Sequence, residues 1–593
     1  MSRMFGVLGA LVAVVLLQPV GVVVAQESAQ EPTEREPLMP FLGNTEDTLT
    51  LDFLFSLTAE RDYDRFVKLP GFDKERPPNS IYDTLSAILD YRSRYFSLFV
   101  DWGMINDGRY DATEPYMRGR YLFINDAHVQ VEGESFSVKA GRTTQKDVVD
   151  TPYSLFVNSR PIPALQLETN YNGTYFFYSN RWVSLNRNSE LIYFGTDSDD
   201  FPLRGRPESV PGTGDTFDEV YADGIPWADR GSNFKVYGLN LGRWRFGIQE
   251  SAVYINQSFN PEFFFSPMPL YFTQLVVDSG GDGAFPWGEY ANSKHIFGFF
   301  ADRTTEDTYI AGQFLFDDIN GGFIPGIETD FQDRLAWSIG GHRDFDFGRV
   351  GLYYAGATKY TFSATSVLER WQERDRNVTQ FTGSDEVPLY YSRRPYPLTY
   401  YPAVEFPDDD GKKRLPIDYR DNYIGYMHGE NNMALMLTYM NVFRPDTGGI
   451  GFHSSLEYVV NGAKSPANPW HEEDSYKDIS DSFVLLNDGT LEHQLRLRAG
   501  VQKDIRIFDT PFSVFAEGEL AVLFNRMRIS PPHKNGEVDI ETTELNNDGD
   551  IVDGPDRTID RNQVEPWIYR PQSGEHDVIG QLTLGVVYRF NLR

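Results

Sequence analysis

The chain has 593 residues, with 86 Asp and Glu against 54 Lys and Arg, which gives a formal net charge of −32. This acidic balance argues against nucleic acid as a partner, because neutralising phosphates requires clustered Lys and Arg. The chain has no cysteine, so disulfides, lipoprotein anchoring and thiolate zinc clusters are excluded.

The N-terminus has the pattern of a secretory signal peptide. Arg3 precedes an apolar run from Phe5 to Leu17, and small residues end at Ala25. The polar, Pro- and Glu-rich stretch that follows predicts a flexible lead. We therefore expect a signal peptide over residues 1–25, a periplasmic lead over 26–45 and an outer-membrane β-barrel over 46–593.

The mature chain has no second apolar run of the length that a spanning helix needs, so a spanning chain of this composition must cross with strands. The 34 Tyr, 44 Phe and 9 Trp suit aromatic girdles at two membrane interfaces. They would equally suit a carbohydrate-binding β-protein.

Alternating apolar and polar residues recur along the chain with turn signals between them. They predict strands over 49–57, 84–92, 95–103, 121–132, 135–142, 171–184, 235–241, 243–255, 294–302, 308–316, 335–342, 350–362, 419–425, 433–443, 451–460, 491–503, 512–524 and 580–593. Long insertions over 197–233, 369–414 and 528–575 separate closely spaced hairpins. This asymmetry predicts an all-β, transmembrane antiparallel β-barrel of roughly 16 to 20 strands with long extracellular loops.

The last stretch is typical of a strand that closes such a barrel. Its apolar positions Leu582, Leu584, Val586, Tyr588 and Phe590 recur at every second residue. Closure leaves no unpaired edge in lipid. A soluble sandwich or solenoid would also alternate, but no fixed repeat of the kind that solenoids show is visible.

A block of motifs from Gly238 to Asp318 is more specific. In order, it has a strand ending in Glu250-Ser251, a Pro-bracketed aromatic turn over 266–271, a strand start at Asn292-Ser293 and a strand ending in Asp317-Asp318. Two further stretches accompany it, Gly141-Arg142 with 153–155 and 159–163 upstream and 423–433 downstream. This order resembles the capsule-assembly Wzi family of outer-membrane barrels, over residues 141 to 443.

The resemblance implies a monomeric outer-membrane lectin that helps to attach or display capsular or other surface polysaccharide and is not an enzyme. The family's best-known form carries an N-terminal helical bundle, for which residues 26–45 leave no room. The expected partners are outer-membrane lipid and lipopolysaccharide, surface polysaccharide and the barrel-assembly machinery. We expect no cofactor.

Arginines on polar strand faces are candidate ligands for the carboxylates or phosphates of an acidic glycan, because they form paired hydrogen bonds. The alternative is that they pair with lumen carboxylates such as Glu517 and Glu519. Within 243–254, Glu250 falls on the lipid-facing parity, so either the strand leaves the membrane there or a bulge changes its register. The candidate ligand-binding residues are Arg142, Tyr153, Arg160, Arg243, Arg245, Arg496 and Arg498.

Two other function classes stay open. The arginine-bearing faces would also serve a porin-type channel for small or anionic solutes. A hydrolase whose catalytic groups lie on separate strands would leave no local motif, and none is present. The acidic stretch 546–556 lacks the spacing and terminal Glu of a calcium loop, so we expect no metal site there.

Overall fold

The computed structural model describes residues 48–61, 79–107, 119–157, 163–186, 192–193, 225–226, 230–255, 258–277, 293–318, 333–362, 425–443, 449–464, 483–507, 510–530, 537–540, 543–545, 551–553, 557–560 and 568–591. The expected signal peptide, the lead, and Arg160 lie outside these ranges.

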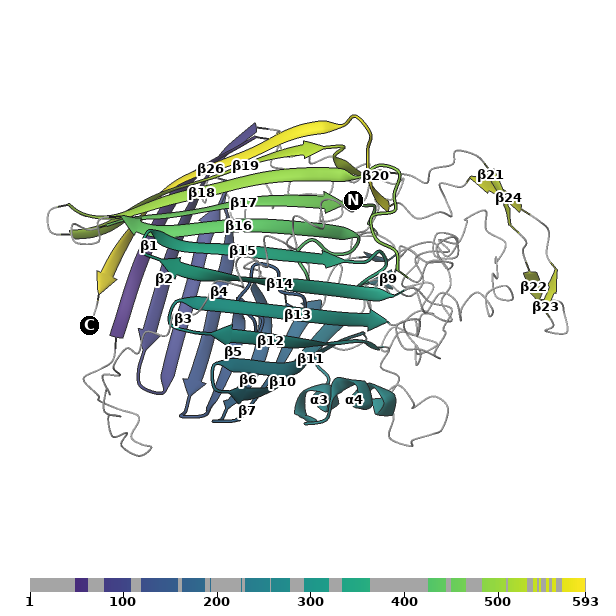
Figure 1. Ribbon diagram of the computed structural model, residues 1–593, viewed down its shortest axis with the longest axis horizontal. Helices are drawn as coiled ribbons and strands as arrows, with labels where there is room; N and C mark the ends of the chain where they lie inside the picture. Colours follow the sequence, from purple (N-terminus) through teal and green to yellow (C-terminus); the bar gives the residue numbers. More distant parts are fainter. Residues whose placement is uncertain are drawn as a thin grey trace, which may run out of the picture. The chain divides into compact units, whose positions relative to one another are not determined.

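Eighteen strands form one antiparallel sheet (Figure 1). They are β1 (Thr48–Arg61), β2 (Asn79–Arg92), β3 (Phe96–Ile105), β4 (Tyr121–Glu132), β5 (Phe136–Thr144), β6 (Pro163–Asn172), β7 (Phe176–Asn186), β10 (Arg230–Leu241), β11 (Trp244–Ile255), β12 (Ser293–Thr304), β13 (Thr308–Asp318), β14 (Arg334–Phe345), β15 (Gly348–Ala357), β16 (Asn432–Phe443), β17 (Ile450–Asn461), β18 (Glu492–Ile507), β19 (Thr510–Phe524) and β26 (His576–Asn591). Each strand pairs with the next barrel strand along the chain.

The sheet closes on itself through its first and last strands. β1 pairs antiparallel with β26 in a continuous register from Thr50↔Asn591 to Arg61↔Gly580. Every barrel strand therefore has two neighbours, which leaves no edge of unpaired backbone groups. The predicted fold class is confirmed: the chain forms an antiparallel β-barrel, its strand number lies within the expected range, and the terminal stretch is the closing strand.

The two ends of the barrel differ in how they connect strands. At one end the chain turns within a few residues, as at 93–95, 133–135, 173–175, 242–243 and 305–307. Gly242 takes a φ of 65° in its two-residue turn, a conformation that suits glycine. The opposite end carries the long connections, including 187–229, 256–292, 358–431 and 525–575. We call these the short-turn end and the long-loop end.

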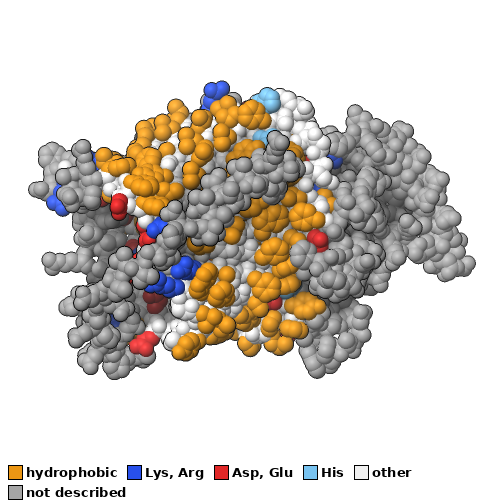
Figure 2. Space-filling model, in the orientation of Figure 1, with side chains coloured by type: hydrophobic (Ala, Val, Ile, Leu, Met, Phe, Trp, Pro, Cys, Tyr) orange, Lys and Arg blue, Asp and Glu red, His pale blue; other side chains and the backbone are white. Residues whose placement is uncertain are grey.

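The alternation predicted from sequence separates the two faces of the wall. On the outer face, Leu495 and Leu497 of β18 and Leu582 and Leu584 of β26 are exposed. The intervening position Arg496 is buried on the inner face. Figure 2 shows hydrophobic side chains gathered over the outside of the strands. The barrel thus has an apolar outside and an inner face that carries polar and charged groups.

Two details of the predicted strands were wrong. Residues 171–184 contain a turn, and the sequence analysis missed β6, which precedes it. Pro163 is the first residue of β6, a position that needs no ladder donor. The predicted strand over 419–425 lies outside the described residues except for Gly425, which is not in a strand.

The remaining elements lie in the long connections. β8 (Ile192–Tyr193) pairs with β9 (Ile225–Pro226), and the β19–β26 connection contains β20 (Met527–Ser530), β21 (Glu537–Ile540), β22 (Thr543–Leu545), β23 (Ile551–Asp553), β24 (Arg557–Asp560) and β25 (Ile568–Pro571). Two short helices, α3 (Pro261–Phe265) and α4 (Leu270–Val277), join β11 to β12. Neither is long and apolar enough to cross a membrane, nor is any other helix in the described part of the chain.

Candidate functional site

The connection after β5 folds into the barrel. We call residues 145–157 the inward segment. Its contacts are with inner-face positions of β11, β13 and β17, and Tyr153, Leu155, Phe156 and Val157 are almost fully buried among apolar side chains of the inner wall. The segment therefore fills part of the lumen instead of extending from the long-loop end.

Asp147 fixes the shape of the inward segment. Its carboxylate accepts from the backbone N–H groups of Val148 (2.6 Å), Phe156 (3.3 Å) and Val157 (3.2 Å). It also accepts from Gln249 Nε2 on β11 at 2.5 Å. One side chain therefore joins both ends of the segment to each other and to the barrel wall.

Two glutamines extend this network across the wall. Gln313 Nε2 on β13 donates to Gln249 Oε1 at 2.7 Å, and Gln313 Oε1 accepts from the Leu155 N–H at 3.0 Å. Each amide both donates and accepts a hydrogen bond. Such a connected network favours one arrangement of the segment.

Near the long-loop end, Glu457 of β17 is a shared acceptor. The Tyr153 hydroxyl donates to Glu457 Oε1 at 2.9 Å, and His428 Nε2 lies 2.7 Å from the same oxygen. His428 belongs to residues 425–431, which precede β16. Tyr153 also packs edge-on against Tyr426, with ring centroids 6.0 Å apart. Two connections thus meet at one lumen carboxylate.

Toward the short-turn end, other contacts hold the beginning of the segment. Arg245 Nη2 donates to the Val148 carbonyl at 3.1 Å, and the Asp150 N–H donates to the Tyr309 hydroxyl at 2.9 Å. Arg245 and Tyr309 lie within a few residues of short turns, whereas Glu457 lies near the other end of its strand. The inward segment therefore extends along the depth of the lumen.

A glycine allows the closest approach between the segment and the wall. A Cβ at Gly298 of β12 would lie 2.0 Å from the Phe314 carbonyl oxygen and 3.0 Å from the Phe156 ring. Any side chain there would displace the wall or the ring. The fit between Phe156 and β12 therefore requires glycine at this position.

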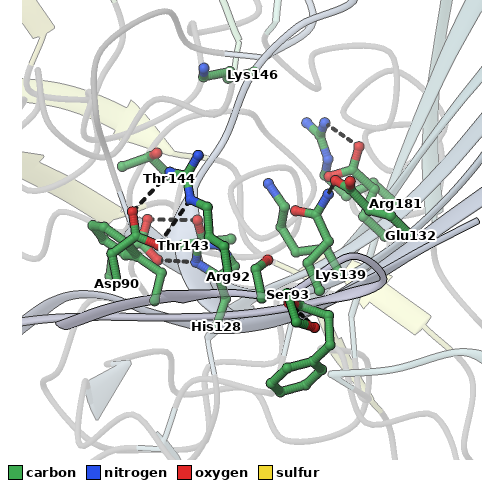
Figure 3. Close-up of a pocket in the computed structure, with 16 residues that line it drawn as sticks. Asp90, Arg92, Ser93, His128, Glu132, Lys139, Thr143, Thr144, Lys146 and Arg181 are labelled. Carbon is green, nitrogen blue, oxygen red and sulfur yellow. Dashed lines mark hydrogen bonds and ion pairs between the residues drawn. The ribbon is translucent and has the colours of Figure 1, made fainter. Parts of the chain in front are cut away.

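A cavity of 520 Å³ lies against the opposite part of the wall (Figure 3). This volume is within the range of small-ligand sites. Its lining comes from β2 to β7 and from the start of the inward segment: Asp90, Arg92, Ser93, Phe96, Ser97, Phe99, Asp126, His128, Gln130, Glu132, Lys139, Thr143, Thr144, Lys146, Glu168 and Arg181.

The carboxylates of this cavity already have partners in the protein. Asp90 pairs with Arg92 through two hydrogen bonds of 3.0 and 2.9 Å. Asp126 accepts from Thr143 at 2.7 Å and contacts His128. Glu132 accepts from Gln130, and Glu168 accepts from Arg181 at 3.1 Å. Their capacity to attract a further cation is reduced accordingly.

Two of the cations are less engaged. Lys139 and Lys146 make no hydrogen bond or ion pair with the described residues, and Figure 3 shows Lys146 apart from the dashed contacts. The Nε of Arg181, on a side chain that is nine-tenths buried, also has no acceptor within the described ranges. The groups of the cavity that still lack a hydrogen-bond partner are therefore mainly cationic donors. This favours binding of an anionic group.

The cavity does not show the geometry of an activated nucleophile. The Thr143 hydroxyl donates to Asp126, and His128 contacts the other oxygen of the same carboxylate. In a nucleophile–base pair the hydroxyl would instead face the imidazole. The arrangement is suited to binding.

Burial sets the protonation of the groups that hold the inward segment. It raises the pKa of the Asp147 carboxyl, and the hydrogen bonds from Gln249 and from backbone amides oppose this increase. Burial, and then the charge of Glu457, raise the pKa of the Tyr153 hydroxyl well above its usual value. Tyr153 therefore remains a neutral donor to Glu457.

None of the candidate residues from the sequence that the structure describes lines the cavity. Arg496 and Arg498 both donate to Glu519, at 3.0 and 2.6 Å. They therefore pair with a lumen carboxylate, which was the alternative to ligand binding. Arg245 forms two hydrogen bonds with Asp302, the longer being 2.9 Å. Arg243 is exposed in the turn between β10 and β11.

Two other candidates have different environments from those expected. Tyr153 is completely buried as an anchor of the inward segment. Arg142 lies on the outer parity of β5, opposite the exposed Leu165, and its Nε donates to the Ile124 carbonyl at 3.0 Å. It therefore does not line the lumen. Binding of a ligand by any of these residues stays a prediction.

Alternation in the sequence puts Lys139 and Gln249 on the polar faces of their strands, but it gives neither residue a role. Strand parity was the available signal for both residues. Lys146 and Asp147 carry no such signal, because they lie in a connection whose path depends on the wall opposite.

No protein-family model and no curated protein sequence matches the chain. Among solved structures, it is similar to Wzi, an outer-membrane protein involved in group 1 capsule assembly in Escherichia coli and described as a carbohydrate-binding β-barrel. The TM-score is 0.41 at 10% identity, over 91% of this chain and 84% of that one.

Two barrels of Pseudomonas aeruginosa are also similar. OccK5 (OpdH) gives a TM-score of 0.38 at 10% identity, over 92% of this chain and 98% of that one. OccK2 (OpdF) in complex with glucuronate gives 0.37 at 8% identity, over 92% and 99%. At these values the comparisons assign neither a family nor a ligand to this chain.

Asp147→Ala tests the role of the inward segment. We expect faster trypsin cleavage after Lys146, because removing the carboxylate leaves buried amide donors unpaired at about 1–3 kcal/mol each. Mass spectrometry of the fragments measures the rate. Asp346→Ala, in the exposed β14–β15 turn, is the control and should cleave like the parent chain. Equal rates for both variants would show that Asp147 does not hold the segment.

Proposed function

We propose that this protein is an outer-membrane β-barrel that binds acidic saccharides in its lumen and is not an enzyme. The observation that carries the proposal is the cavity between β2–β7 and the inward segment, where the carboxylates have hydrogen-bond partners in the protein while neither Lys139 nor Lys146 hydrogen-bonds to a described residue. The membrane placement and the ligand are supported by separate observations.

The two faces of the wall support the membrane placement. Backbone groups in lipid must be satisfied internally, and a closed barrel does this. The outer face exposes large apolar side chains, whereas the inner face carries buried charges such as Glu457 and Arg496. Short turns at one end and long connections at the other follow the plan of outer-membrane barrels, whose long loops are extracellular.

The chemistry of the cavity supports a saccharide with an acidic group. Sugar hydroxyls both donate and accept hydrogen bonds, and this lining offers Ser93, Thr144 and paired charges to them. The ring of Phe99 stacks on His128, with centroids 5.6 Å apart, and adds a flat apolar surface. Lys139 and Lys146 would pair with a carboxylate or phosphate on the sugar.

The wider role proposed for this site is attachment or display of capsular or other surface polysaccharide. The motif order over Gly238–Asp318 motivates it. In this proposal the protein is a monomer, inserted by the barrel-assembly machinery, that contacts lipopolysaccharide with its outer face.

A channel for small anionic solutes is the second candidate. It is favoured by the position of the cavity beside the inward segment, which would make it part of any path left open through the lumen. In this alternative, Asp147 and Glu457 set the width of the pore through the segment that they hold.

Leu584→Arg tests the membrane placement. Leu584 is half exposed on the outer face, between Leu57 and Ala516. We expect a loss of about 2–4 kcal/mol in the free energy of unfolding if it lies at the bilayer midplane. Urea titration of the protein in lipid vesicles measures this. The control is Thr583→Lys, which places a charge in the lumen beside Glu517 and should cost much less. Equal losses would contradict the placement.

Lys139→Met and Lys146→Met test the ligand. We expect each to weaken binding of an oligogalacturonate by about tenfold, or about 1.4 kcal/mol, because a charge-assisted contact is lost. Calorimetry on the folded barrel measures the affinity. The methyl ester of the same oligosaccharide should bind weakly to all variants, and Lys503→Met on β18 should bind like the parent. Unchanged affinity in both cavity variants would remove the assignment.

Single-channel conductance separates the two candidate functions. A saccharide-binding barrel filled by the inward segment should show small or no conductance in planar bilayers, and Asp147→Ala should increase it severalfold. A large, steady conductance in the parent chain, reduced by added acidic oligosaccharide, would instead support the channel.

A further inference from the structure

Charged and polar side chains occupy outer-face positions on four neighbouring strands at the long-loop end. Lys235 of β10 pairs in register with Glu250 of β11, and His295 of β12 lies opposite Ala252 on the same face. His295 Nε2 lies 3.2 Å from Glu250 Oε1. Asn180 and Trp182 of β7 lie on the same face. We call Lys235, Glu250 and His295 the charged set. The register runs through Glu250 without a bulge, so of the two alternatives that the sequence left open for this residue, the bulge is wrong.

A helical cover supplies hydrogen-bond partners to these groups. The cover is residues 258–277, which contain α3 and α4 (Figure 1). Lys235 Nζ donates to the carbonyls of Ser266 (2.5 Å) and Met268 (3.0 Å), and Glu250 Oε2 accepts from the Leu270 N–H at 2.9 Å. The Asn180 and Trp182 side chains donate to the carbonyls of Phe264 and Ser258.

Local sequence shapes the cover for this fit. Asn260 caps α3 by accepting from the N–H groups of Glu262 and Phe263, and Pro261 takes the first helical position. Phe263 and Leu270 are fully buried, and the Phe263 ring stacks on Tyr254 of the wall at 5.2 Å. The inner side of the cover is therefore packed against the outside of the barrel.

The other side of the cover is apolar and exposed. Phe265 is 72% exposed, Tyr271 and Phe272 are each 50% exposed, and Met268 is 49% exposed. This surface continues the outer face of the wall, since the exposed Ile248 lies two residues from Glu250 on β11. If the outer face were in water, solvent would hydrate Lys235 and Glu250 and no cover would be needed. Next to lipid, these charged groups need partners from the protein, which the cover supplies.

We infer that the outward side of this cover, carried by Phe265, Met268, Tyr271 and Phe272, is a lipid-binding surface that contacts acyl chains of the leaflet at the long-loop end. The inference rests on the proposed membrane placement. The cover takes the place of the wall over the charged set, and its exposed rings enter the interfacial region, as the apolar face of an interfacial helix does.

Site-directed spin labelling tests this surface. The natural chain has no cysteine, so each single-cysteine variant carries one nitroxide. Labels at Phe265→Cys and Phe272→Cys are compared with one at Leu497→Cys on the outer wall and one at Glu306→Cys in a short turn. The protein is reconstituted in phosphatidylethanolamine–phosphatidylglycerol vesicles, and collision with oxygen and with a water-soluble nickel chelate is measured.

We expect the labels at Phe265 and Phe272 to collide with oxygen severalfold more than with the nickel chelate, as the Leu497 label does, while the Glu306 label shows the reverse. Labels at Phe265 and Phe272 that behave like the Glu306 label would overturn the inference and leave the membrane barrel standing. A nickel-accessible Leu497 label would instead contradict the membrane placement itself.

Lys235→Met provides a second measurement. Without the two hydrogen bonds from Lys235 Nζ, we expect the Phe272 label to become more mobile, with narrower spectral lines, while the Leu497 label is unchanged. Lys503→Met on β18 is the matched control and should alter neither label. An unchanged Phe272 label in the Lys235 variant would show that the charged set does not hold the cover.

Discussion

The pairing of β1 with β26 is the constraint on which the rest of the structure depends. With that ladder formed, from Thr50↔Asn591 to Arg61↔Gly580, every strand of the wall has two neighbours and no backbone edge remains. Closure also divides all side chains into two sets, because successive residues of a strand point to opposite faces. One set faces outward and is apolar; the other faces a lumen whose polar groups must find partners inside it.

The lumen meets this requirement with its own connections. Gln249, Gln313 and Glu457 are inner-face residues, and the inward segment supplies each of them with a hydrogen-bond partner. Asp147 is the centre of this arrangement because it binds both ends of the segment and the wall. The filling is uneven: the β2–β7 side keeps a cavity with less engaged lysines, and it is this difference within one lumen that gives the protein a candidate binding site.

The same physical problem appears on the outside and is solved in the same way. Glu250 and Lys235 are polar groups on a face that is otherwise apolar, and residues 258–277 fold back to give each of them hydrogen-bond partners. In both places a connection between strands supplies the partners that the strand pattern lacks. Lys235 and Glu250 therefore mark the position where residues 258–277 return to the wall.

The sequence by itself determined the barrel, the closing strand and, for most strand positions, which side chains face in or out. The reason is that a period of two residues is a local property, which the alternation of Leu495, Arg496 and Leu497 shows directly. It also identified Glu250 as an exception to that pattern. Only the tertiary structure decided the paths of the inward segment and the cover, the pairing of Arg496 and Arg498 with Glu519, the outward position of Arg142, and the lysines left at the cavity. The reason is physical: a loop's path is fixed by partners far away in the chain, such as Gln313 for Leu155, and no local pattern encodes which distant groups will meet.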